Sequence, residues 1–426
     1  MDTIVAQASA RGRAGVAVVR ISGPDAWRAC ERMAGAIPPP RTTSLRRLRD
    51  RHGETLDHAL VVTFEEGRSF TGEKITELHL HGSVAVVSAV MRELVTFDGL
   101  RPAEPGEFTR RAFEAGRLDL TEVEGLGDLL EAETDAQRKH AQRIMEGNLA
   151  RMVADWRADL LQALAMSEAA IDFADEDLPP ETWQLVREPL GRVCDALAQE
   201  LAGRRAAERL RDGFEVAIIG PVNAGKSTLL NALAGRDAAI TSEREGTTRD
   251  VIEVRMDIGG LAVTLIDTAG LRDTDDEIEQ LGIARGIERA RGAALRVFLK
   301  AHPDDPVPES TDDDIVLLGK SDLWSEPGVS GKTGDGIDAL VHQIEARLSQ
   351  RACASSSFSR ERHFARLSQA IEHLRRAQDD AQAEMPQLEI VSEEVRHAVF
   401  LLDELVGRIG VEEVLGRIFS SFCIGK

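Results

Sequence analysis

The chain has 426 residues, of which 42% are hydrophobic and 29% charged, and its formal net charge is −21. This length exceeds one ordinary domain, so we expect two or three domains with packed cores. No run of about 18 apolar residues and no secretory signal occurs, and the four cysteines show no metal-binding spacing, so we expect a cytoplasmic protein without a membrane span.

Residues 1–118 mix short apolar runs with a helical pattern. Strands are expected at 16–22, 60–64 and 77–82, a helix at 83–96, and a further helix around Thr109. This pattern predicts an α+β domain, and its composition assigns no chemistry.

Charge is unevenly spread along the chain, because that first part has 17 Lys and Arg against 15 Asp and Glu, whereas the remainder carries −23. If RNA contacts the chain directly, this part is the more favourable surface. Its arginine cluster is either such a surface or a solvated face. The cluster comprises Arg41, Arg46, Arg47, Arg49 and Arg51.

Two later stretches, 118–211 and 360–422, have helical periodicity. In the first, apolar residues recur at three- and four-residue steps, which predicts a long amphipathic bundle helix. The stripe comprises Leu126, Leu129, Leu130, Ile144, Leu149, Trp156, Leu160, Leu161 and Leu164. Acids and prolines at 172–180 interrupt it. The simplest architecture is a helical domain into which the intervening segment is inserted.

Residues 220–228 read Gly-Pro-Val-Asn-Ala-Gly-Lys-Ser-Thr, between an apolar run at 216–219 and a predicted helix at 229–234. This strand, loop and helix form the context of a phosphate-binding loop. Backbone N–H groups and the helix N-terminus would face phosphate oxygens, Lys226 would reach the β- and γ-phosphates, and Ser227 would bind Mg²⁺. The loop's predicted ligand-binding residues are Asn223, Ala224, Gly225, Lys226, Ser227 and Thr228.

Two switch motifs are expected downstream. Residues 246–250 read Gly-Thr-Thr-Arg-Asp, and Thr248 would complete the magnesium shell only when a γ-phosphate is present. An apolar strand ends in Asp-Thr-Ala-Gly, where Asp267 would hold Mg²⁺ through water and the N–H of Gly270 would contact the γ-phosphate. Thr268 and Ala269 complete this motif.

Residues 315–322 read Ile-Val-Leu-Leu-Gly-Lys-Ser-Asp and predict a guanine reader. Asp322 can accept hydrogen bonds from the ring N–H and amino group of guanine, and Lys320 can lie along the ring face, so we expect a GTPase. Most GTPases have Asn in place of Gly319 and Ala in place of Gly331, which follows Ser330 here. Glycine has no side-chain amide, so we expect weaker guanine affinity and specificity.

The chain closes with Phe422, Cys423, Ile424, Gly425 and Lys426. From the residues alone, this is either the frayed end of a helix or a small, cationic tip that belongs to a site.

These stretches together resemble the family of tRNA-modification GTPases named MnmE or TrmE along the whole chain. Residues 3–8, 20–23, 69–73 and 105–108 are similar to that family's folate-binding domain. The resemblance implies an enzyme that works with a flavin-containing (FAD) partner, MnmG, in a heterotetramer or larger complex. Together they would add an (carboxymethyl)aminomethyl group at C5 of the wobble uridine of certain tRNAs.

The resemblance also implies 5,10-methylene-tetrahydrofolate as the one-carbon donor, with 5-formyl-tetrahydrofolate as an analogue. By matching motifs, Arg20, Glu77 and Arg117 would line the folate pocket, and Lys426 would reach in from the C-terminal tip. The family more often has Lys at the Arg117 position, which keeps the charge but changes the geometry. Cys423 is a candidate for one-carbon chemistry.

The family's GTPase is activated by K⁺ and by pairing of two GTPase domains in a homodimer. Asn223 is the matching potassium ligand, and Glu279 matches the residue that orients water, although its acidic surroundings are also typical of surface charge. The loop around the ion would contain Ser242, Glu243, Arg244, Glu245, Gly246 and Thr247. The catalytic residues would be Glu279, Lys226 and Thr248, and the metal ligands Ser227, Thr248, Asn223, Ser242, Arg244 and Thr247.

The predicted fold is therefore a multidomain α/β and all-α protein. It comprises an α+β folate-binding and dimerisation domain (1–118), a discontinuous helical domain (119–212 and 349–426) and an inserted P-loop, Ras-like GTPase domain (213–348). Two alternatives remain open: a regulatory or ribosome-assembly GTPase switch without modification chemistry, and a family member with a degraded GTPase, suggested by Gly319.

Overall fold

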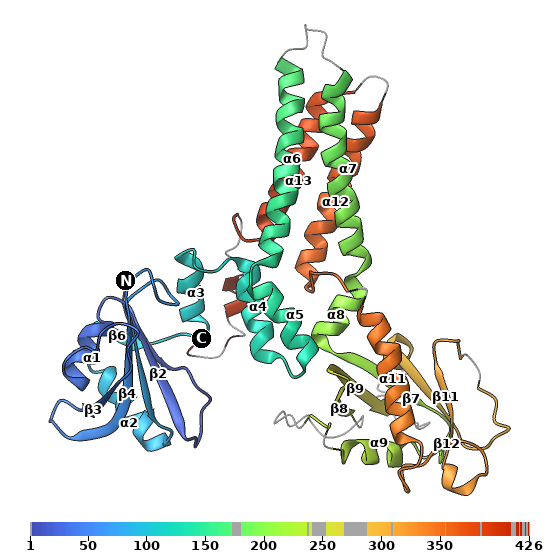
Figure 1. Cartoon of the computed structure of the whole chain (residues 1–426), viewed down its shortest axis with the longest axis horizontal. Coiled ribbons are helices and arrows are strands. Elements are labelled where there is room, and N and C mark those ends of the chain that lie inside the picture. Colours follow the sequence, from blue (N-terminus) through green and yellow to red (C-terminus); the bar gives the residue numbers. More distant parts are fainter. Residues whose placement is uncertain are drawn as a thin grey trace, which may run out of the picture. The chain divides into compact units, whose positions relative to one another are not determined.

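The computed structural model describes residues 2–172, 180–236, 238–240, 253–267, 288–307, 310–353, 355–383 and 386–409, and residues 415, 416, 418, 419, 422 and 425. The chain forms two compact units (Figure 1). The first contains residues 1–127 and 406–426, and the second residues 128–405.

The first unit is built on a six-stranded sheet of order β3-β4-β5-β2-β1-β6. Its strands are antiparallel except for the parallel pair β1 and β6. The strands span Thr3–Gln7 (β1), Val16–Ser22 (β2), Ser44–Arg49 (β3), Thr55–Phe64 (β4), Ile75–His81 (β5) and Leu100–Pro102 (β6).

Two helices, α1 (Ala26–Ala34) and α2 (Val84–Leu94), pack their apolar residues on one face of this sheet. Strand residues alternate between its faces, so every second side chain of β2 and β5 enters that core. On the other face Ile4 and Ala6 pack against Phe108 of α3 (Glu107–Glu114). Helix α4 (Leu120–Glu131) follows.

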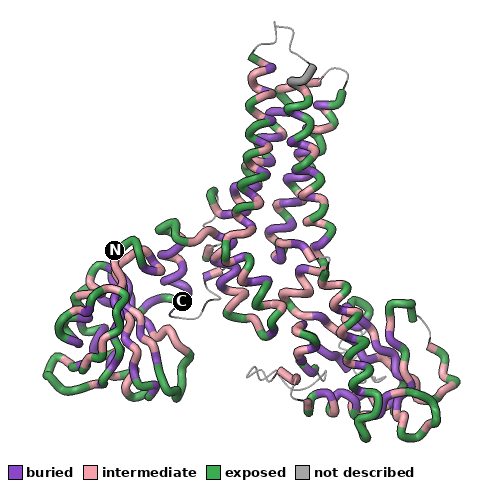
Figure 2. Tube along the Cα trace, viewed as in Figure 1, coloured by how far each residue is buried: buried purple, intermediate pink, exposed green. Residues whose placement is uncertain are grey.

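The second unit contains a bundle of four long helices, in which each contacts two neighbours in the cyclic order α6, α7, α12, α13. They span Asn148–Asp172 (α6), Pro180–Ala202 (α7), Glu361–Gln382 (α12) and Leu388–Leu405 (α13). Figure 2 shows buried residues along their facing sides. Each fully buried leucine in such a core stabilises the fold by roughly 1.5–3 kcal/mol.

The continuous apolar stripe expected from residue 126 onward is wrong in detail. The structure divides it among α4, α5 (Asp135–Met145) and α6. A capping box between Thr134 and Gln137 begins α5, and Gly147, with φ 76°, lies between α5 and α6. Leu130 and Leu161 are consequently 48% and 37% exposed. The later stretch is likewise two helices, α12 and α13.

A second six-stranded sheet, of order β12-β11-β10-β7-β9-β8, lies between the two halves of the bundle in the sequence. All its pairs are parallel except β8 with β9. The strands span Phe214–Ile219 (β7), Glu253–Ile258 (β8), Leu261–Asp267 (β9), Leu295–Lys300 (β10), Ile315–Gly319 (β11) and Gly328–Val329 (β12). Helices α8 (Arg204–Asp212), α9 (Lys226–Ala234) and α11 (Ile337–Ala352) accompany the sheet.

The predicted fold class is confirmed: an α+β unit, a helical bundle in two sequence segments, and an inserted α/β sheet. In the parallel part of that sheet, the loops after β7, β9 and β11 meet at one edge, which is where such folds bind ligands. Within the described ranges, no helix is both long and apolar enough to cross a membrane.

Candidate functional site

The loop between β7 and α9 has the geometry of a phosphate cradle. Asn223 and Gly225 have φ values of 66° and 97°, which turn the backbone sharply before α9 begins at Lys226. The Nζ of Lys226 donates hydrogen bonds to the carbonyl oxygens of Gly220 at 2.7 Å and Pro221 at 2.9 Å. Burial lowers the pKa of Lys226, and the charge of Asp267 partly offsets that effect. A positive group is thus held over the loop.

Two oxygen atoms that could act as metal ligands lie close together beside this loop. The hydroxyl of Ser227, in the first turn of α9, donates to Oδ2 of Asp267 at 2.9 Å. Asp267 is the last residue of β9 and is 5% exposed. A hydroxyl and a carboxylate at this distance form a donor set suited to Mg²⁺, which prefers oxygen ligands.

A cavity of about 290 Å³ adjoins the phosphate loop. Its lining includes Gly225, Lys320, Asp322 and Ser330. The hydroxyl of Ser330 donates to Oδ1 of Asp322 at 2.7 Å and accepts hydrogen bonds from the amides of Lys332 and Thr333, each at 3.3 Å. These contacts orient the Asp322 carboxylate at the cavity.

The structure brings together the predicted residues of the phosphate loop, Asp267 and the two base-reading loops. Several other predicted residues lie outside the described part of the chain. They are Ser242, Glu243, Arg244, Glu245, Gly246, Thr247, Thr248, Thr268, Ala269, Gly270, Glu279, Cys423 and Lys426.

A second group of predicted residues lies on the first sheet. Arg20 of β2 and Glu77 of β5 are register partners, and their side chains form an ion pair at 2.9 Å. The Arg20 guanidinium lies 5.7 Å from the ring centroids of both Phe70 and Phe108. An arginine near two aromatic rings is thus paired with a carboxylate, and both side chains are partly exposed.

Phe70 and Phe108 did not emerge from the sequence as individual site residues. The available signal was their position inside the two short motifs at 69–73 and 105–108. In sequence each could equally be an ordinary core residue, and Phe108 is indeed fully buried.

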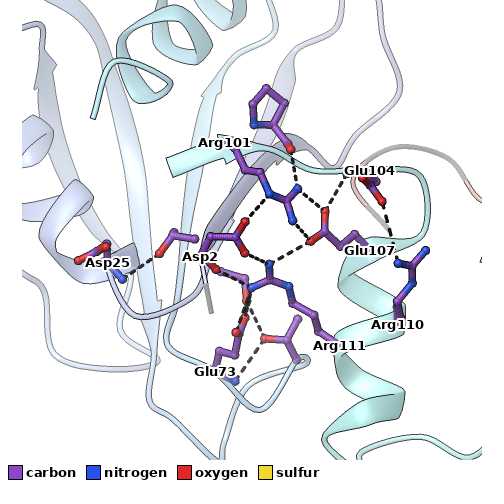
Figure 3. Close-up of polar contacts among 12 residues, drawn as sticks. Asp2, Asp25, Glu73, Arg101, Glu104, Glu107, Arg110 and Arg111 are labelled. Carbon is purple, nitrogen blue, oxygen red and sulfur yellow. Dashed lines mark hydrogen bonds and ion pairs between the residues drawn. The ribbon is translucent and has the colours of Figure 1, made fainter. Parts of the chain in front are cut away.

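A charged network supports the loop that carries Phe70 (Figure 3). Arg111 of α3, 9% exposed, donates to carboxylate oxygens of Asp2, Glu73 and Glu107 at 2.9–3.1 Å. Arg101 also binds Glu107 and Asp2. Burial opposes ionisation of Glu107, but the hydrogen bonds from Arg101 and Arg111 prevail, so the pKa of Glu107 lies below its ordinary value. The network ties the start of β1, the 69–73 loop and α3 together.

Arg117 and Gly425 adjoin other parts of the same unit. Arg117 donates to the carbonyl of Gly67 at 3.3 Å and its stem lies near Gly72, so it borders the loop that contains Phe70. The backbone at Gly425 contacts the backbone of Gln7 so closely that a Cβ there would lie 2.2 Å from the Gln7 carbonyl oxygen. Gln7 follows Ala6, the register partner of Arg20.

A larger cavity, of about 480 Å³, lies among the end of α4, α5, α8, β8 and Arg360, which precedes α12. None of the predicted site residues lines it. Two of its arginines are paired with acids of the same lining: Arg255 with Glu133 at 3.0 Å, and Arg360 with Asp128 at 2.5 Å. Size alone therefore does not identify the functional site.

Comparison with known proteins gives matches to both units. Residues 120–423 match the family model described as the MnmE helical domain, and residues 3–117 match that of the GTP-binding protein TrmE N-terminus. The chain is 54% identical over 431 residues to the tRNA modification GTPase MnmE of Cereibacter sphaeroides strain ATCC 17025. It is 52% identical over 432 residues to that of Dinoroseobacter shibae. Both alignments cover 100% of this chain and of the relative.

Proposed function

The chain belongs to the MnmE (TrmE) family of tRNA modification GTPases. On this premise we propose that it hydrolyses GTP at the phosphate loop and that this hydrolysis is coupled to modification of the tRNA wobble uridine. The observation that supports the nucleotide site most strongly is the convergence of the phosphate loop, the Ser227–Asp267 pair and Asp322. These are the groups needed to hold phosphates, a magnesium ion and guanine.

In the proposed GTP complex, Lys226 exchanges its bonds to loop carbonyls for bonds to the β- and γ-phosphates. The N-terminus of α9 faces the same oxygens and adds its partial positive charge. Asp322, held by Ser330, accepts the two N–H donors on the Watson–Crick edge of guanine. Ser227 and Asp267 are the residues that would hold Mg²⁺, directly and through water respectively.

Bound magnesium neutralises charge on the β- and γ-phosphates during hydrolysis. We propose Thr248 as a further ligand and Glu279 as the residue that orients the attacking water. Potassium activation would use Asn223 and oxygens of the 242–247 loop, when two GTPase domains pair in a homodimer. These roles rest on the family resemblance.

The Arg20 and Glu77 pair supports a folate site on the first unit. The aminopyrimidinone edge of a folate presents N–H donors that a carboxylate can bind in pairs, and its anionic tail suits a guanidinium. We propose that Glu77 accepts hydrogen bonds from the aminopyrimidinone edge, while Arg20, Arg117 and Lys426 balance the negative charge of the folate tail. Phe70 and Phe108 would supply apolar contact around Arg20.

The proposed reaction, in the cytoplasm, adds an (carboxymethyl)aminomethyl group at C5 of the wobble uridine of certain tRNAs, with MnmG as the FAD-carrying partner. Methylene-tetrahydrofolate supplies the one-carbon unit when bound. The near-neutral charge of residues 1–118, against −23 for the remainder, makes residues 1–118 the more favourable surface for tRNA.

The proposal can be tested at three levels. GTP hydrolysis should be faster in KCl than in NaCl, and 5-formyl-tetrahydrofolate should bind saturably, with lower affinity once Lys426 is deleted. tRNA from cells lacking the protein should lose its modified wobble uridines. A full set of modified uridines in that tRNA would defeat the modification role, even if GTP hydrolysis is found.

A further inference from the structure

The two departures from the usual guanine motifs, Gly319 and Gly331, lie where the base-reading loops touch the phosphate loop. A Cβ built on Gly319 would lie 2.1 Å from the carbonyl oxygen of Ala224 and 3.2 Å from that of Lys300. Real Cβ atoms essentially never approach another heavy atom closer than 3.0 Å. The φ of Gly319 is not in the left-handed region, so the requirement for glycine here is one of space.

Gly331 is equally confined, against a different element. A Cβ there would lie 2.6 Å from three backbone atoms, the N of Leu229 and the C and O of Thr228. These atoms belong to the first turns of α9, directly after the phosphate loop. Even the alanine usual at this position would therefore press on a helix backbone.

Both sides of these contacts are anchored. Gly319 ends β11, where it pairs with Val329, and the preceding Leu318 pairs with Lys300. Ala224 is 1% exposed and belongs, with Leu229, to the core of this sheet. Neither backbone can retreat without disturbing the sheet or the core, and interiors packed in this way resist added volume.

A third contact completes the closure. Lys320, with φ 54°, lays its stem beside Gly225, where the Cγ would lie 3.5 Å from a Cβ on the glycine. Asp322 follows two residues later on the same loop and is held by Ser330, the neighbour of Gly331. The position of the guanine-reading carboxylate thus depends on both glycines.

We propose that Gly319 and Gly331 determine how this chain binds guanine: they let both base-reading loops close directly onto the backbone of the phosphate loop and α9. The base is then read by Asp322 in a site that has no room for the usual asparagine. Restoring the usual residues weakens nucleotide binding. This inference rests on the proposed GTP site, because it concerns how that site holds the base.

The test is calorimetric titration of GDP and IDP into the full-length protein and its Gly319→Asn, Gly319→Ala and Gly331→Ala variants. Each variant should bind GDP about tenfold more weakly or worse, because the added side chain displaces the base-reading loops from the position that binds guanine. The preference for GDP over IDP, which lacks the 2-amino group, should also fall because Asp322 is displaced. Gly292→Ala is the matched control, because a Cβ at this glycine, in the same α/β part of the chain, meets nothing within 4 Å.

Gly319→Asn or Gly331→Ala binding GDP as tightly as the unaltered protein, with its base preference kept, would overturn the inference. Thermal unfolding without nucleotide identifies a variant that fails to fold, and the inference is then judged on the other glycine. If the unaltered protein itself does not bind GDP, the proposed nucleotide site is what fails.

Discussion

Replacing Arg111 by methionine tests whether the charged network of the first unit positions the 69–73 loop at the proposed folate site. The guanidinium is 9% exposed and binds carboxylates of Asp2, Glu73 and Glu107, whereas methionine keeps only the apolar stem. Removing one partner of a buried ion pair costs roughly 3–5 kcal/mol. Glu107 keeps its hydrogen bond from Arg101, and Glu73 keeps its hydrogen bond from Ser22. We therefore expect a loss of folding stability at the lower end of this range, about 3 kcal/mol.

For a unit of this size, about 3 kcal/mol corresponds to a fall in melting temperature of about 6–12 °C. The loop that carries Phe70 also loses its bond from Arg111 to Glu73, so the affinity for 5-formyl-tetrahydrofolate should fall about tenfold. The assays are calorimetric unfolding and folate titration. Arg28→Met is the control, since Arg28 is 63% exposed in its pair with Asp25 and should cost at most about 1 kcal/mol.

The acid dependence gives a second readout of the same network. The pKa values of Glu107 and Asp2 are lowered in the folded state, so their contribution is present above the ordinary carboxylate pKa and is lost as pH falls through the folded values. The difference in melting temperature between the unaltered protein and Arg111→Met should therefore shrink as the solution is acidified. An unchanged melting temperature together with full folate affinity would refute the reasoning.

Four further substitutions test the two proposed sites. Lys226→Ala should weaken GTP binding about 10- to 100-fold, measured with a fluorescent GTP analogue, because a charged donor to phosphate is lost; unaltered affinity would remove Lys226 from the site. Ser330→Ala should lower the GDP-to-IDP affinity ratio, and Asp322→Asn should favour XDP, whose 2-carbonyl accepts from the new amide; calorimetry with the three nucleotides decides both. Glu77→Gln should weaken 5-formyl-tetrahydrofolate about tenfold and leave GTP hydrolysis by the isolated protein intact, so a loss of hydrolysis would contradict two independent sites.

The convergence of the phosphate loop, Asp267 and the base-reading loops could be predicted because each motif is defined by neighbouring residues in the sequence. A strand, a glycine-containing turn and a helix at 216–234 leave few alternatives, and parallel strands carry their following loops to one edge of the sheet. Ser227 therefore meets Asp267, and Ser330 meets Asp322, across 40 and 8 residues of sequence respectively. The type of each residue and its position after a strand were sufficient.

The strand within the arginine cluster at 41–51 could not be predicted from local sequence in this way. Ser44–Arg49 is an edge strand, β3, although its charges hide the alternation of a half-buried strand. Leu48 is fully buried while Leu45 is 66% exposed, and a register irregularity lies between Leu48 and Arg49. Charge on an edge strand opposes pairing with other sheets, so tertiary context explains this pattern better than local sequence does.

The glycines at 319 and 331 are a second case in which tertiary context decides what local sequence does not, here at the proposed nucleotide site. In the sequence, Gly319 and Gly331 each lack a side chain that the motif usually has, which predicts weaker guanine binding. In the structure, the carbonyl of Ala224 and the start of α9 occupy the space that those side chains would need. Whether a missing side chain weakens a site depends on what fills its volume, and that is set by a sheet whose strands are drawn from residues 214–329. The consequence reverses the expectation from the motif: adding the usual asparagine should harm guanine binding in this chain.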